Sequence, residues 1–165
     1  IMSSMKIDDL IFASCRGGWP ASLNRKTEKA QLMVVKDYIN SVCKTDISSV
    51  DGVSRDDKLT RLILRTYARN ISTLARKSNM LKDIRANVET CSDNTLDDYL
   101  NALNKLFVIQ DVDAWSPAVR SATAIRRSPK REFVDPSIAV AVLGLTPETL
   151  LMDLKTFVSK FNFFS

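Results

Sequence analysis

The residue types most often used for catalysis are few and scattered in this sequence. The 165-residue chain contains no histidine, so it cannot build a Ser-His-Asp or Cys-His site, nor a zinc site that needs imidazole. Its three cysteines, Cys15, Cys43 and Cys91, are one short of a four-cysteine metal site and include no CxxC pair. We therefore expect reduced thiols in a cytoplasmic protein, no metal or cofactor held by this chain, and no enzymatic activity.

Phosphate-binding loops and paired carboxylates are equally hard to find. The sequence contains neither a GxxxxGK[ST] loop nor a GxGxxG fingerprint. The adjacent pairs Asp56-Asp57 and Asp97-Asp98 diverge around a helix, so capping of helix N-termini explains them better than acid–base chemistry. Binding, rather than catalysis, is the function that these residue types favour.

A cluster of basic residues is the best candidate for a functional site. The net charge is +5, from 24 basic and 19 acidic residues, and the basic residues are concentrated in parts of the chain. The candidate nucleic-acid-binding residues are Arg120, Arg126, Arg127, Lys130 and Arg131. Dense cations on a loop suit phosphate contacts. The alternative is a solvated loop, or one that docks on an acidic surface of the same protein.

Helices must position this loop. Apolar residues at three- and four-residue steps predict amphipathic helices over 21–42, after a capping box at Ser54, and after Ser92. Ser72 is predicted to cap a short helix over 75–78. Asp135 and Thr146, each followed by proline, predict two further helix starts, the last helix reaching about residue 157.

Short strands are predicted on either side of the basic loop. Leu106–Ile109 and Val112–Trp115 precede the loop, and Glu132–Val134 follows it. The expected fold is therefore mainly α-helical, built around a winged helix-turn-helix with a small β-hairpin. We divide the chain into an N-terminal turn and helix (1–52), a winged-helix-like domain (53–135) and C-terminal helices with a tail (136–165).

The composition fits a globular chain. Apolar residues make up 45% and charged residues 26% of the sequence, enough to bury a core. The longest apolar run, Ile138–Leu143, is far too short to cross a bilayer, and no signal peptide is visible. We therefore expect no membrane contact.

Several segments together resemble one known family. The segments are Arg16–Pro20, Tyr67–Ile71, Thr95–Leu106, Phe107–Asp111, Ala114–Pro117, Arg120-Ser121, Ser128–Arg131 and Phe133–Ser137. They are similar to the uncharacterised domain that follows the core of predicted bacterial and archaeal AAA-type ATPases. The resemblance covers nearly the whole chain, although the ATPase core and its phosphate loop are absent from this sequence.

The resemblance implies an accessory role. The expected function is a non-catalytic domain of such an ATPase that contacts protein or nucleic acid through a basic wing; ATP is implied only for the missing core. Expected partners are that core, another protein or nucleic acid. The alternatives are a fragment of an ATPase or nuclease-like enzyme, or an oligomerisation module that forms a homo-oligomer.

Two features of the helices bear on the choice of partner. Asp93, Asp97 and Asp98 lie at the start of the predicted recognition helix, where carboxylates would repel phosphates. A stripe of basic residues repeats every four positions on an earlier helix, at Arg61, Arg65 and Arg69. The stripe is typical of a solvated helix face, and contact with phosphates is the alternative.

Overall fold

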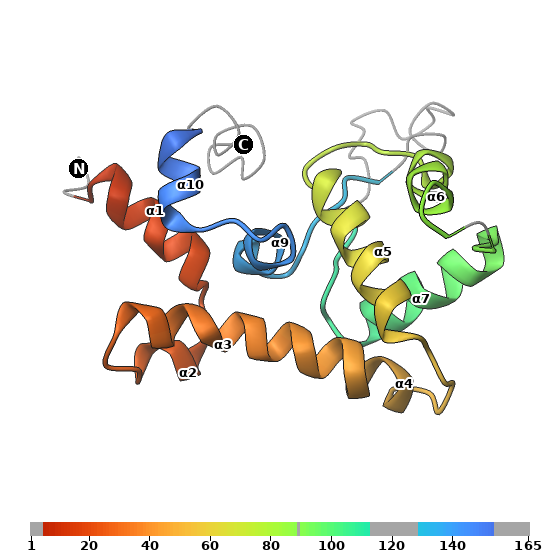
Figure 1. Ribbon diagram of the computed structural model, residues 1–165, viewed down its shortest axis with the longest axis horizontal. Helices are drawn as coiled ribbons and strands as arrows, with labels where there is room; N and C mark the ends of the chain where they lie inside the picture. Colours follow the sequence, from red (N-terminus) through yellow and green to blue (C-terminus); the bar gives the residue numbers. More distant parts are fainter. Residues whose placement is uncertain (1–4, 89, 113–128, 154–165) are drawn as a thin grey trace, which may run out of the picture.

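The computed structural model describes residues 5–88, 90–112 and 129–153. Within these ranges the chain is mainly helical, as predicted (Figure 1). The first part contains α1 (Ile7–Arg16), α2 (Pro20–Leu23), α3 (Glu28–Ser41), a π-helical turn (Val42–Asp46) and α4 (Ile47–Ser49). The rest contains α5 (Asp57–Arg69), α6 (Lys77–Arg85), α7 (Asp93–Lys105), α9 (Pro136–Val142) and α10 (Pro147–Met152). No helix in the described ranges is long and apolar enough to cross a membrane.

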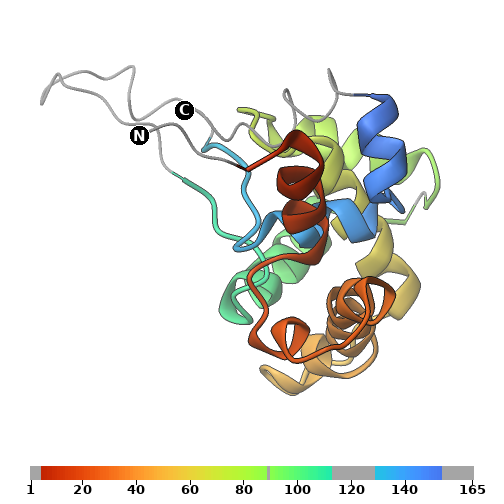
Figure 2. The same ribbon diagram turned by 90° about the vertical axis from the view of Figure 1, so that its left-hand side faces the viewer.

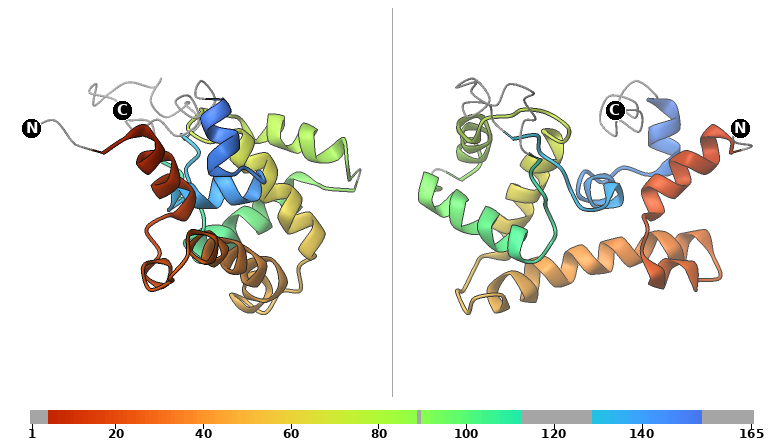
Figure 3. Two further views of the ribbon diagram at one scale, coloured as in Figure 1. Left: turned by 60° about the vertical axis from the view of Figure 1, so that its left-hand side comes forward. Right: turned by 180° about the vertical axis from the view of Figure 1, so that it is seen from behind.

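Helix α9 lies at the centre of the arrangement. It packs against α1 and α3 on one side and against α5 on the other. Figure 1 shows α1 and α10 at one end of the molecule and α5, α6 and α7 at the other, and the view from behind agrees (Figure 3). From the side, α1 lies in front of α9 and α3 is seen nearly end-on (Figure 2).

The buried side chains form one continuous core. Ile11 of α1, Tyr67 of α5 and Ile138 of α9 are fully buried members of it. The core includes residues from all three segments into which we divided the sequence. Tyr67 also makes an edge-to-face contact with Phe133, with ring centroids 5.0 Å apart. Burial of these apolar surfaces is the main stabilising contribution to the fold.

Three helix starts agree with the sequence analysis. Ser92 accepts a hydrogen bond from the backbone of Thr95 at 3.0 Å. Asp135 caps α9 in the same way, and Thr146 caps α10. A proline follows each of these last two caps, where its missing N–H has no intrahelical partner to lose.

Other helix boundaries differ from the prediction. The helix expected over 21–42 is two helices, because Pro20 begins a short turn of helix and Thr27 caps a new one. Helix α5 starts after Asp56, whose carboxylate accepts from the backbone of Leu59 at 2.7 Å. The expected cap, Ser54, lies outside the helix. Helix α1 was not predicted at all.

The region after α5 also departs from the prediction. Ser72 does not cap a helix: it has a φ of 58°, and its hydroxyl donates to the Glu132 carboxylate at 3.1 Å. The helix expected over 75–78 instead starts at Lys77 and continues to Arg85. Ser72 is therefore held by a contact with a distant segment, which local patterns do not reveal.

The strands predicted beside the basic loop are reduced to isolated antiparallel bridges among the described residues. One bridge joins Ile109 to Phe133, and another joins Val112 to Lys130. Phe107, expected in a strand, instead has a φ of 54° and ends the turn after α7. The end of the second predicted strand, 113–115, lies outside the described residues.

Candidate nucleic-acid interface

Backbone pairing holds the two ends of the predicted basic loop together. Val112 and Lys130 exchange N–H···O hydrogen bonds of 2.9 and 2.8 Å. The ammonium of Lys130 lies 3.1 Å from the Glu132 carboxylate, and its side chain is one third exposed. The other predicted cations of the loop, Arg120, Arg126 and Arg127, lie outside the described residues. Lys130 is thus partly neutralised where the chain leaves the loop.

Arg131 has a different position from the one the sequence predicts. It is only 5% exposed, and its guanidinium forms an ion pair with Asp111. Its backbone accepts a hydrogen bond from Ser72 at 2.8 Å and donates one to Thr73 at 3.1 Å. A buried guanidinium that is already paired cannot reach a phosphate, so we assign Arg131 to the framework of the fold.

A buried tyrosine completes the network around Asp111. The hydroxyl of Tyr67 donates to Asp111 at 2.5 Å and accepts from the backbone N–H of Glu132 at 3.1 Å. Burial, and then the neighbouring Asp111 carboxylate, raise the pKa of Tyr67 well above its usual value. The tyrosine therefore stays neutral and fixes the base of the loop to α5.

The carboxylates of α7 are paired with cations of the same chain. Asp93 lies 3.6 Å from Arg85, and Asp97 forms an ion pair with Lys77. Asp98 accepts two hydrogen bonds, both 2.9 Å, from a single guanidinium. This pairing reduces the repulsion that we expected between the start of α7 and phosphate groups.

The guanidinium that holds Asp98 belongs to Arg55. The Arg55 side chain is 1% exposed and also contacts Asp51 at 2.7 Å and the backbone carbonyl of Ile47 at 2.6 Å. Hydrogen bonds from Arg55 are the main reason why the pKa of Asp51 falls to about 2. We call Arg55, Asp51 and Asp98 the Arg55 clamp. The sequence analysis missed it, because Asp98 lies 43 positions from Arg55 in the chain.

Two of the exposed amides of α7 line a cavity. Asn101 and Asn104 are exposed, and within the described part of the chain neither side chain has a hydrogen-bond partner. They line a cavity of about 280 Å³ together with Lys77, Pro129 and Arg131. An Asn amide both donates and accepts, as recognition of a base edge requires. In the sequence, both residues lie outside the apolar stripe of this helix, and that position was the signal that could have revealed them.

The basic stripe of α5 divides into two parts. Arg61 forms an ion pair with Asp57 at 2.8 Å and a hydrogen bond with Asn40 at 3.0 Å. Arg65 and Arg69 are exposed and line a separate cavity of about 360 Å³. The stripe is therefore not one uniform surface.

The turn at Gly17 and Gly18 contacts the start of α9. The Gly18 N–H donates to the Asp135 carboxylate at 2.8 Å, and the Trp19 indole donates to the Ser137 hydroxyl at 2.8 Å. We call this contact the Gly-Trp clasp. It brings together two segments that carry the family resemblance, and it explains Trp19 as a packing residue.

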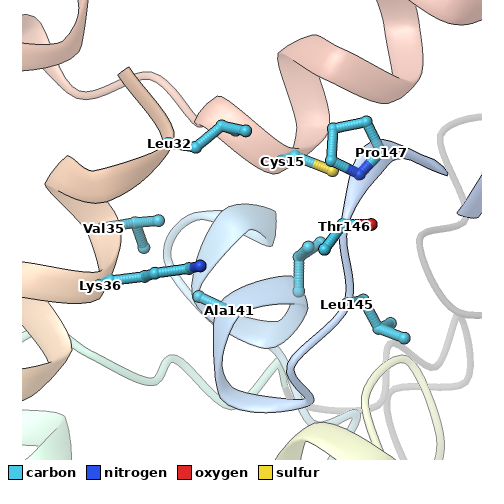
Figure 4. Close-up of a pocket in the computed structure, with 9 residues that line it drawn as sticks. Cys15, Leu32, Val35, Lys36, Ala141, Leu145, Thr146 and Pro147 are labelled. Atoms are coloured by element: carbon cyan, nitrogen blue, oxygen red, sulfur yellow. The ribbon is translucent and has the colours of Figure 1, made fainter. Parts of the chain in front are cut away.

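The described residues offer no nucleophile of unusual reactivity. Cys15 lies in a shallow apolar groove between α1, α3 and α9, which Lys36 borders (Figure 4). Burial, and then Glu148, raise the pKa of Cys15 to about 11, and burial raises that of Cys43 to a similar value. The thiolate forms are therefore disfavoured. No group of metal-ligating side chains occurs in the described ranges.

Comparison with known proteins places the chain in a family. Residues 7–149 match the model of a family described as a domain of unknown function, DUF8612. The chain belongs to this family. No curated protein and no solved structure matches the chain.

The matched range starts with the first residue of α1 and ends within α10. The Gly-Trp clasp, the Arg55 clamp and the amide face of α7 all lie inside it. These features therefore belong to the DUF8612 domain itself and not to a flanking segment.

Proposed function

We propose that this DUF8612 domain is a non-catalytic accessory domain that binds nucleic acid through α7 and the basic loop. The proposed fold is a winged helix, in which α5, α6 and α7 form the helical part. The paired segments around Ile109 and Phe133 form the base of the wing.

The backbone contacts of Arg131 support this fold. Its N–H and C=O bond to the turn between α5 and α6, while its neighbour Lys130 pairs with Val112. The segment after the loop, around Lys130 and Arg131, thus has a backbone neighbour on each side. The short strands of a winged helix pair in this order. The third helix of such a fold is the one that enters the major groove.

The observation that favours nucleic acid as the partner is the pairing of every aspartate in the first half of α7. Asp93, Asp97 and Asp98 each have a cationic partner, which weakens their repulsion of phosphate groups. Besides these paired aspartates, α7 exposes the amides of Asn94, Asn101 and Asn104 and the ammonium of Lys105. The adjacent loop adds its cluster of arginines for phosphate contacts.

The resemblance supports the accessory role: in this proposal an AAA-type ATPase core acts in the same protein, and the domain couples it to nucleic acid. Contact with protein, including that core, is the second candidate. Phe107 favours contact with protein, because this residue is 76% exposed and its backbone has a φ of 54°. A large aromatic residue rarely occupies that conformation without a local constraint.

Fluorescence anisotropy of labelled duplex and single-stranded DNA, measured over a salt series, tests the proposal. The loop variant carries Arg120→Ala, Arg126→Ala and Arg127→Ala, and it keeps Arg131 because that residue stabilises the fold. We expect binding that weakens steeply with salt, and a salt slope that falls by up to about 3 in the variant.

A control with the same loss of charge carries Lys26→Ala, Lys29→Ala and Lys44→Ala in the N-terminal part of the chain. It should bind DNA like the wild type. Equal weakening in the two variants would indicate a non-specific effect of net charge, and no binding at low salt would refute the proposal.

A further inference from the structure

The cavity beside Arg65 and Arg69 is a second candidate binding site. Its walls are Leu62, Arg65, Thr66 and Arg69 of α5, Asp83 of α6, Asn87 two residues after α6, and Leu143 after α9. Its volume of about 360 Å³ is within the range of small-molecule sites. The four residues of α5 recur at three- and four-residue steps, so one face of a rigid helix supplies them.

This cavity and the predicted nucleic-acid interface lie on different sides of α5. Tyr67, which supports the base of the loop, is two positions from both Arg65 and Arg69. Two positions correspond to about 200° around a helix. The two cavities also share no lining residue.

Charge is distributed unevenly within the cavity. Two guanidiniums from α5 line one wall, and such groups bind phosphate with charge-assisted hydrogen bonds. The wall from α6 and the residues after it contains the Asp83 carboxylate, which accepts hydrogen bonds, and the Asn87 amide, one N–H of which donates to the Asp83 backbone carbonyl at 3.2 Å. A ligand therefore needs an anion at one end and hydrogen-bond donors at the other.

We propose that the cavity binds a phosphate ester with a hydroxylated body. The phosphate contacts Arg65 and Arg69, the hydroxyl groups donate to Asp83, and Leu62 and Leu143 pack against the carbon atoms. This proposal does not depend on nucleic-acid binding at α7. The phosphate comes either from a small sugar phosphate or from the diester of a nucleic acid, and the test distinguishes these sources.

Isothermal titration of the full chain with ribose 5-phosphate, ribose and the dinucleotide TpT tests the proposal. We expect binding of the phosphate ligands and none of ribose. Arg65→Ala should weaken binding about tenfold, the loss expected for one charged hydrogen bond. Arg61→Ala is the matched control: that side chain is one helical turn away, is paired with Asp57, and should leave binding unchanged.

A variant of the wall from α6 adds a second readout. Asp83→Asn should strengthen binding of inorganic phosphate, because it removes a negative charge, and should weaken binding of ribose 5-phosphate relative to inorganic phosphate. The loop variant should bind both as the wild type does, so failure of the nucleic-acid proposal would not affect this result.

Arg65-dependent binding of either phosphate ligand supports the site, and the tighter ligand identifies the source. The proposal is overturned if neither ligand binds, or if Arg65→Ala binds as well as the wild type. Circular dichroism checks that the variants fold, which we expect because Arg65 is exposed.

Discussion

Two arginines of this domain are buried deeply enough to need carboxylate partners. The side chains of Arg55 and Arg131 are 1% and 6% exposed. Taking a guanidinium out of water costs several kcal/mol, and close carboxylates offset that cost. Asp51 and Asp98 do so for Arg55, and Asp111 for Arg131. Removing Asp111 therefore leaves the buried charge of Arg131 without a carboxylate, whereas Arg55 keeps one partner if the other is removed.

Asp111→Ala should reduce the free energy of unfolding by about 3 kcal/mol, because it leaves the Arg131 guanidinium without a carboxylate and the Tyr67 hydroxyl with only the Glu132 carbonyl as acceptor. Urea denaturation measures the loss. Adding Arg131→Met should restore part of the stability, since no buried charge then remains. Asp37→Ala, at an exposed position, is the control; an equal loss there would contradict the assignment.

The Arg55 clamp predicts a specific dependence on pH. The pKa of Asp51 is about 2 in the folded protein, against an ordinary value of 3.8. Because the folded-state pKa is the lower one, the ionised carboxylate stabilises the fold. That contribution is complete above about pH 5 and is lost as the pH falls from about 4 to 2.

Asp51→Asn should therefore flatten the curve of unfolding free energy against pH between about pH 4 and 2. Chemical denaturation at a series of pH values measures it. A curve for the variant that is as steep as that of the wild type would show that Asp51 does not contribute.

At the scale of elements, the Gly-Trp clasp joins the end of α1 to the start of α9. Gly17 has a φ of 75° and a ψ of −179°, a conformation nearly restricted to glycine. A Cβ at this position would lie 2.4 Å from the Ser137 hydroxyl and 2.5 Å from the Asp135 carboxylate. Any side chain at residue 17 would push these two elements apart.

Gly17→Ala should lower the free energy of unfolding by about 3 kcal/mol or more, from backbone strain and from steric overlap. Gly144 is the matched control: its φ is 70°, but no atom lies within 4 Å of its Cβ position. Gly144→Ala should cost only about 1 kcal/mol. Thermal unfolding compares the two, and equal losses would show that the clasp adds nothing beyond backbone strain.

Local sequence patterns predict some features of these elements and miss others. Ser92, Asp135 and Thr146 were identified because a cap and the residues after it are adjacent in the chain. Ser54 was predicted as a cap because Ser54 and Asp57 have the spacing of a capping box, whereas in the structure Asp56 caps the helix. The burial of Arg131 depends on Asp111, twenty positions away, so a basic cluster read from the sequence could not reveal it.

At the scale of the whole molecule, α9 links the elements that carry the two proposed binding surfaces through one core. It contacts α1, α3 and α5, and the clasp fixes its N-terminus through Asp135. Asn101 and Asn104 of α7 and the cavity beside Arg65 and Arg69 of α5 are therefore presented by a packed framework. The partners of Asp97 and Asp98 were not predictable for the same reason as that of Arg131, because they lie 20 and 43 positions away in the chain.

Mapping of backbone amide chemical shifts during titration with a short DNA duplex tests the central claim most directly. We predict perturbations around Asn101, Asn104 and Lys130, and none at Gly18 or along α3. Asn101→Ala with Asn104→Ala should weaken the perturbations without changing the fold. Shifts that leave α7 unaffected, or an unchanged spectrum at low salt, would contradict the assignment of α7 as a nucleic-acid-binding helix.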